Sequence, residues 1–203
     1  MTIDELKKNA IENNIPIMQD GAIEYIKRRI KLFNLNKILE IGTAVGYSAA
    51  QMASVSDKVH VTTIEKDAER FMMATKNINA LEMHEQIDLI FNDALTLDIV
   101  EKYNLIVIDA AKGKNAHFFE KYKKNLLNNG FIIIDNINFH GLVGKSETIS
   151  SKNLRQLVEK IEDFLEYLKT QEGEFYVEIV DEGDGLAVCQ RKWVNEIFIN
   201  TKK

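Results

Sequence analysis

The spacing of hydrophobic and polar residues changes near residue 35. Before that point, apolar residues recur at helical spacing, which predicts helices at 2–14 and 21–32, with Pro16 between them. After it, short apolar runs alternate with longer amphipathic stretches. The runs are 37–41, 59–64, 87–91, 105–108 and 131–134, and the stretches are 47–54, 67–81, 94–101, 115–127 and 151–169. Strands that alternate with helices predict a parallel sheet covered on both faces.

The pattern changes again near the C-terminus. Two apolar runs, 175–180 and 186–191, flank the sequence Glu182-Gly183-Asp184-Gly185. A short Asp/Gly turn between two strand-like runs predicts an antiparallel hairpin. We therefore expect an α/β fold with a mostly parallel seven-stranded sheet. The expected single domain, 1–203, consists of N-terminal helices at 1–34, the core at 35–192 and a tail at 193–203.

Carboxylates recur at the ends of the predicted parallel strands. They are Glu40, Glu65, Asp93, Asp109 and Asp135. One acid after a strand is an ordinary helix cap or turn residue. Five in the same topological position favour a ligand crevice, because ligands of open α/β sheets bind outside the carboxyl ends of the strands.

The loop after the first strand contains two glycines, Gly42 and Gly46, separated by three residues. Glycine allows a tight turn and a close approach of the backbone to a ligand. The spacing differs from G-x-G-x-x-G, which disfavours a pyrophosphate-binding loop. Glu65 ends the second strand about 20 residues later, where an acid can accept both ribose hydroxyls.

Two further strand ends supply hard oxygen ligands. Asp109 ends one strand, and Asp135 and Asn136 end the next. Such a set suits Mg²⁺, Mn²⁺ or Ca²⁺ rather than zinc, although both acids could simply cap helices. The four histidines show no metal-ligand spacing, and Cys189 is expected in the core.

Composition narrows the possible partners and compartment. The chain has 26 basic and 31 acidic residues and a net charge of −5, so a uniformly basic nucleic-acid surface is excluded. Local basic clusters remain, at 27–31, 112–114, 121–124 and 202–203, and each is expected to be an ordinary solvated face. The lone cysteine and the lack of a membrane-length apolar run or secretory pattern favour the cytoplasm and no membrane partner.

The run 38–48, Ile-Leu-Glu-Ile-Gly-Thr-Ala-Val-Gly-Tyr-Ser, resembles the cofactor loop of class I S-adenosylmethionine methyltransferases. It is particularly similar to the cation-dependent O-methyltransferases related to catechol and caffeoyl-CoA O-methyltransferases. The resemblance implies a Rossmann-like fold and S-adenosylmethionine as methyl donor. It assigns donor binding to Met18, Glu40, Gly42, Ser48, Glu65, Asp93, Ala94 and Asp109. Within this set, Glu40, Gly42 and Ser48 face the methionine part, Glu65 the ribose, and Asp93 and Ala94 the adenine.

The same resemblance implies a metal site and its chemistry. Asp109, Asp135 and Asn136 correspond to the metal ligands of the family, which use Mg²⁺ or Mn²⁺. A substrate hydroxyl would bind the metal, which lowers the pKa of that hydroxyl. Lys112, together with Asp109, would be catalytic, the lysine as a base or an electrostatic partner. The alternative for Lys112 is an ordinary exposed lysine.

Several short segments look like the bacterial tRNA 5-hydroxyuridine methyltransferases: 14–18, 109–113, 135–136 with 141–143, and 183–187. That branch implies methylation of 5-hydroxyuridine to 5-methoxyuridine in the tRNA anticodon loop. The first alternative is an O-methyltransferase of small catechol-like molecules. A nucleotide-binding oxidoreductase and a non-catalytic binding module are two further alternatives. The family also implies a homodimer, in which Trp193 and Phe198 form either a dimer contact or a packed tail.

Overall fold

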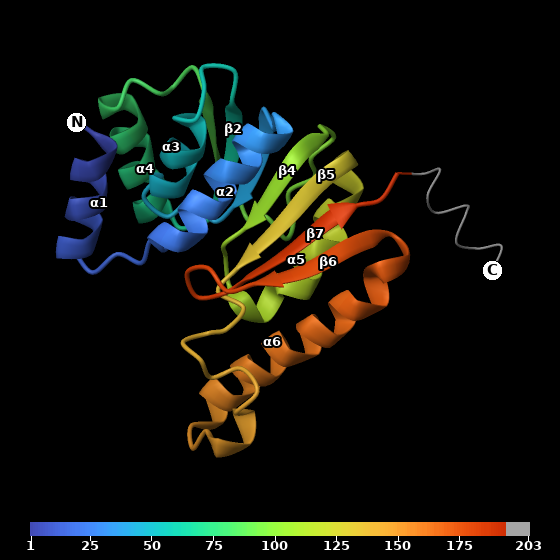
Figure 1. Cartoon of the computed structure of the whole chain (residues 1–203). Coiled ribbons are helices and arrows are strands. Elements are labelled where there is room, and N and C mark those ends of the chain that lie inside the picture. The colour runs from blue at the N-terminus through green and yellow to red at the C-terminus, as the bar shows by residue number, and fades with distance from the viewer. Residues whose placement is uncertain (194–203) are drawn as a thin grey trace.

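The computed structural model describes residues 1–193, and the remaining tail, including Phe198, lies outside the described residues. Seven strands form one sheet in the order β3-β2-β1-β4-β5-β7-β6 (Figure 1). The strands are β1 (Lys37–Ile41), β2 (His60–Glu65), β3 (Ile87–Phe91), β4 (Tyr103–Ile108), β5 (Leu126–Asp135), β6 (Phe175–Val180) and β7 (Leu186–Arg191). The first five pair in parallel, and β7 pairs antiparallel with both β5 and β6. The predicted fold class and hairpin are confirmed.

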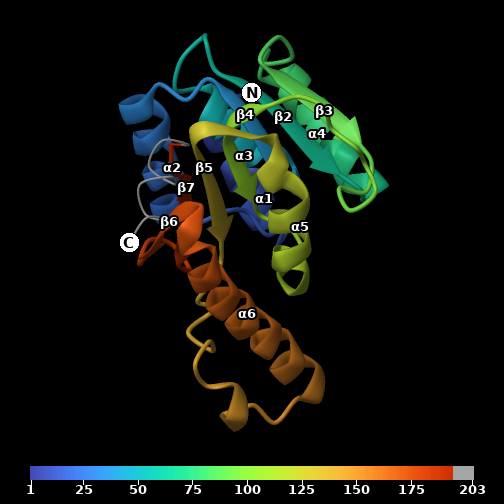
Figure 2. The same ribbon diagram turned by 90° about the vertical axis from the view of Figure 1, so that its right-hand side faces the viewer.

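Helices cover both faces of this sheet (Figures 1 and 2). They are α1 (Ile3–Glu12), α2 (Asp20–Phe33), α3 (Tyr47–Ala53), α4 (Ala68–Ala80), α5 (Asn115–Tyr122) and α6 (Lys152–Thr170). Side chains of α1 to α4 pack on one face of the sheet, and those of α5 and α6 pack on the other. Strand alternation sends Leu105 to the first face and Ile106 to the second. Burial of both faces is the reason that the strands are apolar throughout.

The carboxyl ends of the central strands are aligned. Ile41 is the register partner of both Ile64 and Ile108, and Ile108 pairs with Ile134. The chain leaves β1 toward β2 and β3, and then returns to the opposite side of β1 as β4. The strand order therefore reverses beside β1, which is where an open α/β sheet leaves a crevice for a ligand.

The helix predicted at 94–101 is absent, and this prediction was wrong. Residues 94–96 form a turn in which the Asp93 carboxylate accepts the Leu95 N–H at 2.8 Å. The chain then runs without regular structure to β4, while Leu95, Leu97 and Ile99 pack against the core. These leucines and the isoleucine are spaced by two residues, which is the period of an extended segment rather than of a helix.

The start of β5 was also predicted incorrectly. Helix α5 ends at Tyr122, and Leu126 and Leu127 belong to β5 instead of the helix. Leu126 is the register partner of Tyr103 at the start of β4. Pairing with the neighbouring strand therefore outweighs the helical spacing of the sequence at this point.

Helix α6 and the loop before it project from the body of the molecule as an arm (Figures 1 and 2). The Ser151 side chain caps the helix, and the Glu162 carboxylate accepts the Gly144 N–H at 2.7 Å. These bonds hold the loop against the helix. Within residues 1–193, no helix is long and apolar enough to cross a membrane.

Candidate active site at the carboxyl edge of the sheet

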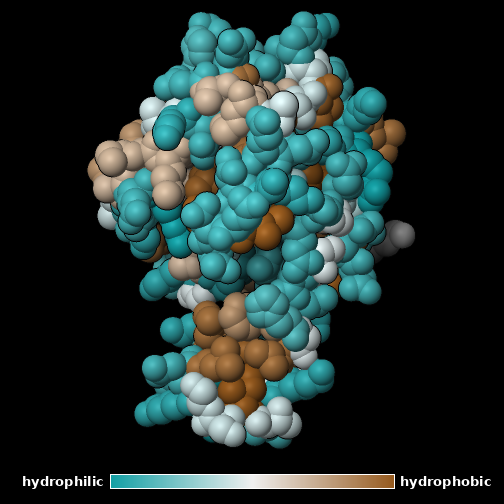
Figure 3. Space-filling view, turned by 90° about the vertical axis from the view of Figure 1, so that its left-hand side faces the viewer, coloured by the Kyte–Doolittle hydropathy of each residue, from teal (hydrophilic) through white to brown (hydrophobic). Residues whose placement is uncertain are grey.

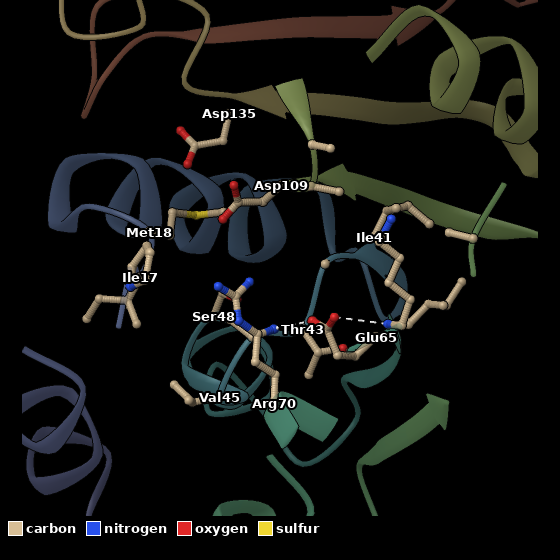
Figure 4. A pocket seen from close by; sticks show the side chains of 18 of the residues that line it. Ile17, Met18, Ile41, Thr43, Val45, Ser48, Glu65, Arg70, Asp109 and Asp135 are labelled. Atoms are coloured by element: carbon tan, nitrogen blue, oxygen red, sulfur yellow. Dashed lines mark hydrogen bonds between the residues drawn. The ribbon is translucent and has the colours of Figure 1, made fainter. Parts of the chain in front are cut away.

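A cavity of about 390 Å³ lies at the carboxyl edge of the sheet, beside the point where the strand order reverses (Figure 4). It contains nearly all of the residues that the sequence singles out. Those lining it are Met18, Gly42, Ser48, Glu65, Asp93, Ala94, Asp109, Lys112, Asp135 and Asn136. Its volume is in the range of small-molecule sites. The predicted convergence of the strand-end residues is therefore observed, with the exception of Glu40.

Close packing at Gly42 brings the first and fourth strand ends together. Gly42 has a φ of +101°, and a Cβ there would lie 2.2 Å from the Asp109 carbonyl oxygen. No other residue type fits this position without moving the loop after β4. The glycine thus keeps the cofactor loop next to Asp109.

Glu65 fastens the glycine loop to the end of β2. Its carboxylate accepts the backbone N–H groups of Ala44, Lys66 and Asp67, each at 2.9 Å. Ala44 has a φ of +47°, a conformation that this bond helps to hold. The carboxylate is consequently fixed at the cavity wall.

Glu40 lies behind the cavity wall and is not one of the lining residues. It is fully buried, and its carboxylate accepts hydrogen bonds from the hydroxyls of Ser48 and Thr63. Burial raises the pKa of Glu40 to about 8, although the two hydroxyl bonds oppose that rise. Glu40 therefore reaches the cavity through Ser48, whose hydroxyl it orients, and through Thr63, whose hydroxyl is 2.6 Å from that of the lining residue Thr43.

The side of the cavity expected to hold the adenine is built from the turn after β3. The Asp93 carboxylate is half exposed, with the Lys66 ammonium 4.0 Å away. The Ala94 carbonyl accepts the Tyr122 hydroxyl at 2.7 Å, which ties this turn to α5. Met18 is buried and points into the cavity from the N-terminal segment (Figure 4).

Of the two predicted metal-binding acids, Asp109 is paired with an ammonium group and, among the described residues, Asp135 is not. The Lys112 Nζ lies 2.6 Å from an Asp109 oxygen, and the side chains of Lys112 and Asp109 are 12% and 22% exposed. Asp135 is buried, which raises its pKa, and the negative charge of Asp109 raises it further. The Asn136 amide is 2.7 and 3.1 Å from the two Asp135 oxygens.

This donor set fits a divalent cation. Asp135 is a buried carboxylate and Asp109 a partly buried one. One lysine compensates them, which leaves a local excess of negative charge, and oxygen donors suit Mg²⁺ or Mn²⁺. Within residues 1–193, no three His, Cys, Asp or Glu side chains are grouped to hold a metal. The Asn136 amide would therefore have to be the third protein ligand.

Arg70 is a lining residue that the sequence analysis missed. It lies in the first turn of α4, one turn beyond the capping residue Asp67, and its guanidinium is directed into the cavity (Figure 4). Among the described residues, its guanidinium makes no hydrogen bond or ion pair. Its position at the start of the helix that follows Glu65 was the available signal.

The basic cluster on α2 is only partly the solvated face that was expected. The Arg28 side chain is 62% exposed, but those of Lys27 and Arg29 are 28% and 23% exposed. Arg29 packs on the Tyr25 ring and donates to its hydroxyl. Lys27 pairs with Glu24, Arg28 with Glu182 and Arg29 with Glu178.

Cys189 is buried in β7, as predicted for a core residue.

Comparison with known proteins identifies the family. The sequence profile of the O-methyltransferase family matches residues 1–192. The chain belongs to the O-methyltransferase family. Fold and family therefore agree with the resemblance found in the cofactor loop.

The O-methyltransferase is similar to both plant and bacterial proteins. It is 26% identical to the caffeoyl-CoA O-methyltransferase of Populus kitakamiensis over 177 residues, which cover 82% of this chain and 74% of that protein. A Staphylococcus aureus protein assigned as a caffeoyl-CoA O-methyltransferase is 36% identical, with a TM-score of 0.89 over 94% of this chain and 92% of that one. The Bacillus cereus O-methyltransferase, solved in complex with S-adenosylhomocysteine, is 22% identical, with a TM-score of 0.80 over 94% and 90% of the two chains.

These relatives do not support the predicted closeness to the tRNA 5-hydroxyuridine methyltransferases. The names of the plant relatives refer to small molecules, caffeoyl-CoA and, in Vitis vinifera, a flavonoid. The alternative from the sequence, a small-molecule O-methyltransferase, fits the comparisons better than the tRNA enzyme.

Proposed function

We propose that this O-methyltransferase transfers the methyl group of S-adenosylmethionine to a hydroxyl of a small catechol-like molecule, with Mg²⁺ or Mn²⁺. The observation that carries the proposal is one cavity that joins the glycine loop and Glu65 to the carboxylates of Asp109 and Asp135 and the Asn136 amide. The first group suits a nucleoside with ribose hydroxyls. The second suits a hard cation.

The methyl donor would lie along the loop after β1. Glu65 would accept the ribose hydroxyls, because its carboxylate is already fixed by three backbone N–H groups. Ser48 and Met18 would line the methionine end, and Asp93 and Ala94 the adenine end. The structure of the Bacillus cereus O-methyltransferase with S-adenosylhomocysteine shows that this fold accommodates the demethylated donor.

Asp109, Asp135 and Asn136 would hold the cation, which lowers the pKa of a substrate hydroxyl when bound. Lys112 would stabilise the negative oxygen through its ammonium group or, in its neutral form, take the hydroxyl proton on Nζ; this atom lies 2.6 Å from Asp109 in the same part of the cavity. The oxygen then attacks the methyl carbon, a C–O bond forms and the C–S bond breaks. Positioning of both substrates at one edge of the sheet would supply much of the rate gain.

The test is methyl transfer from radiolabelled S-adenosylmethionine with Mg²⁺. Parallel reactions contain catechols or bulk tRNA from cells that lack 5-methoxyuridine. We expect label in the catechols, and we expect it to disappear with a chelator and in Asp135→Ala. The control is Asp88→Ala, an exposed strand acid outside the cavity, which should retain activity. Transfer that persists with the chelator would contradict the metal requirement.

Label in tRNA alone would overturn the small-molecule substrate in favour of the anticodon loop. The tRNA partner, the homodimer and the cytoplasmic location remain predictions.

A further inference from the structure

The loop that follows the predicted metal residues has an unfavourable backbone conformation. Asn136, Phe139 and His140 have φ values of +60°, +44° and +57°, and Gly141 has a φ of +72°. Residues other than glycine adopt such values rarely, and they keep them only where surrounding contacts hold them. Two consecutive residues of this kind, Phe139 and His140, require a specific restraint.

The restraint is the side chain of Asp184 in the turn between β6 and β7. Both of its carboxylate oxygens accept the His140 backbone N–H, each at 2.9 Å, and the His140 Nδ1 is 3.4 Å from one of them. The Asp184 side chain is 8% exposed. Among the described residues, hydrogen bonds to this carboxylate come from His140 alone. The Asp184 carboxylate therefore accepts hydrogen bonds from the loop after β5 and not from other residues of the β6–β7 turn.

Backbone contacts extend this connection. The Asn138 N–H donates to the Asp184 carbonyl at 2.9 Å, and the Ile137 N–H donates to the Gly185 carbonyl at 3.1 Å. A Cβ at Gly185 would lie 2.6 Å from Asn138 Cγ, so the turn and the loop are in close contact.

The contact lies beside the metal-binding part of the cavity. Asp135, the last residue of β5, is the register partner of Leu186, the first residue of β7. The turn at Asp184 therefore directly adjoins the segment that begins at Asp135 and Asn136. The rings of Phe139 and His140 lie side by side on this segment, with centroids 5.5 Å apart, and the His140 side chain is 69% exposed.

We infer that Asp184 is a positioning residue that holds the loop 137–141 in its left-handed conformation, so that the methyl acceptor meets a preformed wall beside Asp135 and Asn136. The inference rests on the proposed function for the identity of the reaction. The loop would contribute to acceptor binding, since loops on a rigid scaffold commonly provide such contacts. The donor part of the cavity does not depend on this contact.

The test compares Asp184→Ala and Asp184→Asn with Asp181→Asn, an exposed acid at the start of the same turn. For Asp184→Ala we expect kcat/KM for the acceptor to fall about tenfold or more, mainly through KM, because small displacements of docking groups are costly. Asp184→Asn keeps one acceptor oxygen and should have a smaller effect. The dissociation constant for S-adenosylhomocysteine should stay within about twofold of wild type for all three variants. An unchanged acceptor KM in Asp184→Ala, or a parallel loss of S-adenosylhomocysteine binding, would overturn the inference.

A second measurement does not depend on the acceptor. Hydrogen exchange of the peptide that spans 137–143 should become faster in Asp184→Ala and not in Asp181→Asn. If exchange changes in this way but wild type methylates no acceptor, the proposed function fails while the restraint by Asp184 stands. If exchange is unchanged, the restraint itself is wrong.

Replacement of His140 by glycine tests whether Asp184 acts by holding the backbone of the loop at residue 140. Glycine adopts a positive φ at little cost, so the loop needs less restraint in His140→Gly. Asp184→Ala should then reduce kcat/KM by a smaller factor in the His140→Gly background than in wild type. Equal factors in both backgrounds would contradict the inference.

Discussion

The Lys112 Nζ lies 2.6 Å from a carboxylate oxygen of Asp109, and both side chains line the cavity. Among the described residues, Lys112 carries the only ammonium group in the metal-binding half of the cavity. Asp109 carries one of the two carboxylates there. Replacement of Lys112 by methionine keeps the apolar stem and removes the charge. We expect kcat to fall by about 10²-fold or more, the range for loss of a general acid–base group.

The control for this change is Lys114→Met, two residues further along. Lys114 is exposed and is not a lining residue, so its loss should leave kcat within about twofold of wild type, as for an ordinary surface position. Initial rates and binding of S-adenosylhomocysteine should be measured for both variants. Equal rates in both would mean that Lys112 has no part in catalysis.

Metal binding can be measured without turnover. Titration with Mn²⁺, followed by the electron paramagnetic resonance signal of the free ion, should show a site in wild type that is lost in Asp135→Asn. Asn136→Ala removes a neutral ligand and should weaken binding by a smaller factor, about 10- to 100-fold. Asp88→Asn, an exposed acid in β3, should bind as wild type does. A wild-type protein that fails to bind Mn²⁺ at millimolar concentration would refute the metal site.

Arg70 should contribute to binding of the methyl donor. Its guanidinium points into the cavity without an acidic partner among the described residues, and the donor carries one free carboxylate (Figure 4). An Arg–carboxylate pair is a strong, geometrically specific contact. Arg70→Gln should therefore weaken S-adenosylhomocysteine binding by about tenfold, a loss typical of one charged hydrogen bond.

The decarboxylated form of S-adenosylhomocysteine provides the discriminating measurement. It should bind wild type and Arg70→Gln equally if the guanidinium recognises the carboxylate. Lys76→Gln changes a cation on the same helix outside this cavity and should affect neither ligand. A similar loss of affinity for both ligands in Arg70→Gln would assign the arginine a different role.

Glu40 should make stability depend on pH. Its pKa is about 8 in the folded protein because of burial, against an ordinary value of 4.5. Between these values the folded chain binds a proton that the unfolded chain does not, so the contribution of Glu40 to stability falls as pH rises through this window. The slope is at most about 1.4 kcal/mol per pH unit.

Glu40→Gln removes this dependence. Urea unfolding at pH 6 and pH 8.5 should show that wild type loses more stability between the two pH values than the variant does. The exposed substitution Glu69→Gln should follow wild type. Parallel losses in wild type and Glu40→Gln would show that Glu40 stays charged when folded.

The arm formed by α6 and the loop before it carries apolar surface on the face that is visible in Figure 3.

Most of the architecture was predictable from local patterns. Parallel strands buried on both faces must be continuously apolar. The acids at the strand ends can be recognised in the sequence because the apolar runs stop there. Gly42 and Glu65 could be assigned in the same way, since a close approach requires glycine and a strand end projects its residue into the crevice. The segment 94–101 was predicted as a helix although Leu95, Leu97 and Ile99 follow the period of an extended chain. The packing of these side chains against the core accounts for the extended course.

By itself, the sequence determined the succession of strands along the chain, the helices other than the one wrongly predicted at 94–101, the glycine loop and the set of oxygen donors, because each depends on periodicity or on the residue at a strand end. Tertiary structure alone decided that Glu40 faces Ser48 and Thr63 behind the cavity wall, that Arg70 turns into the cavity, and that Asp184 restrains His140. These relationships join residues 8 to 44 positions apart. The direction of a side chain and the charge around it depend on such partners, which local spacing does not specify.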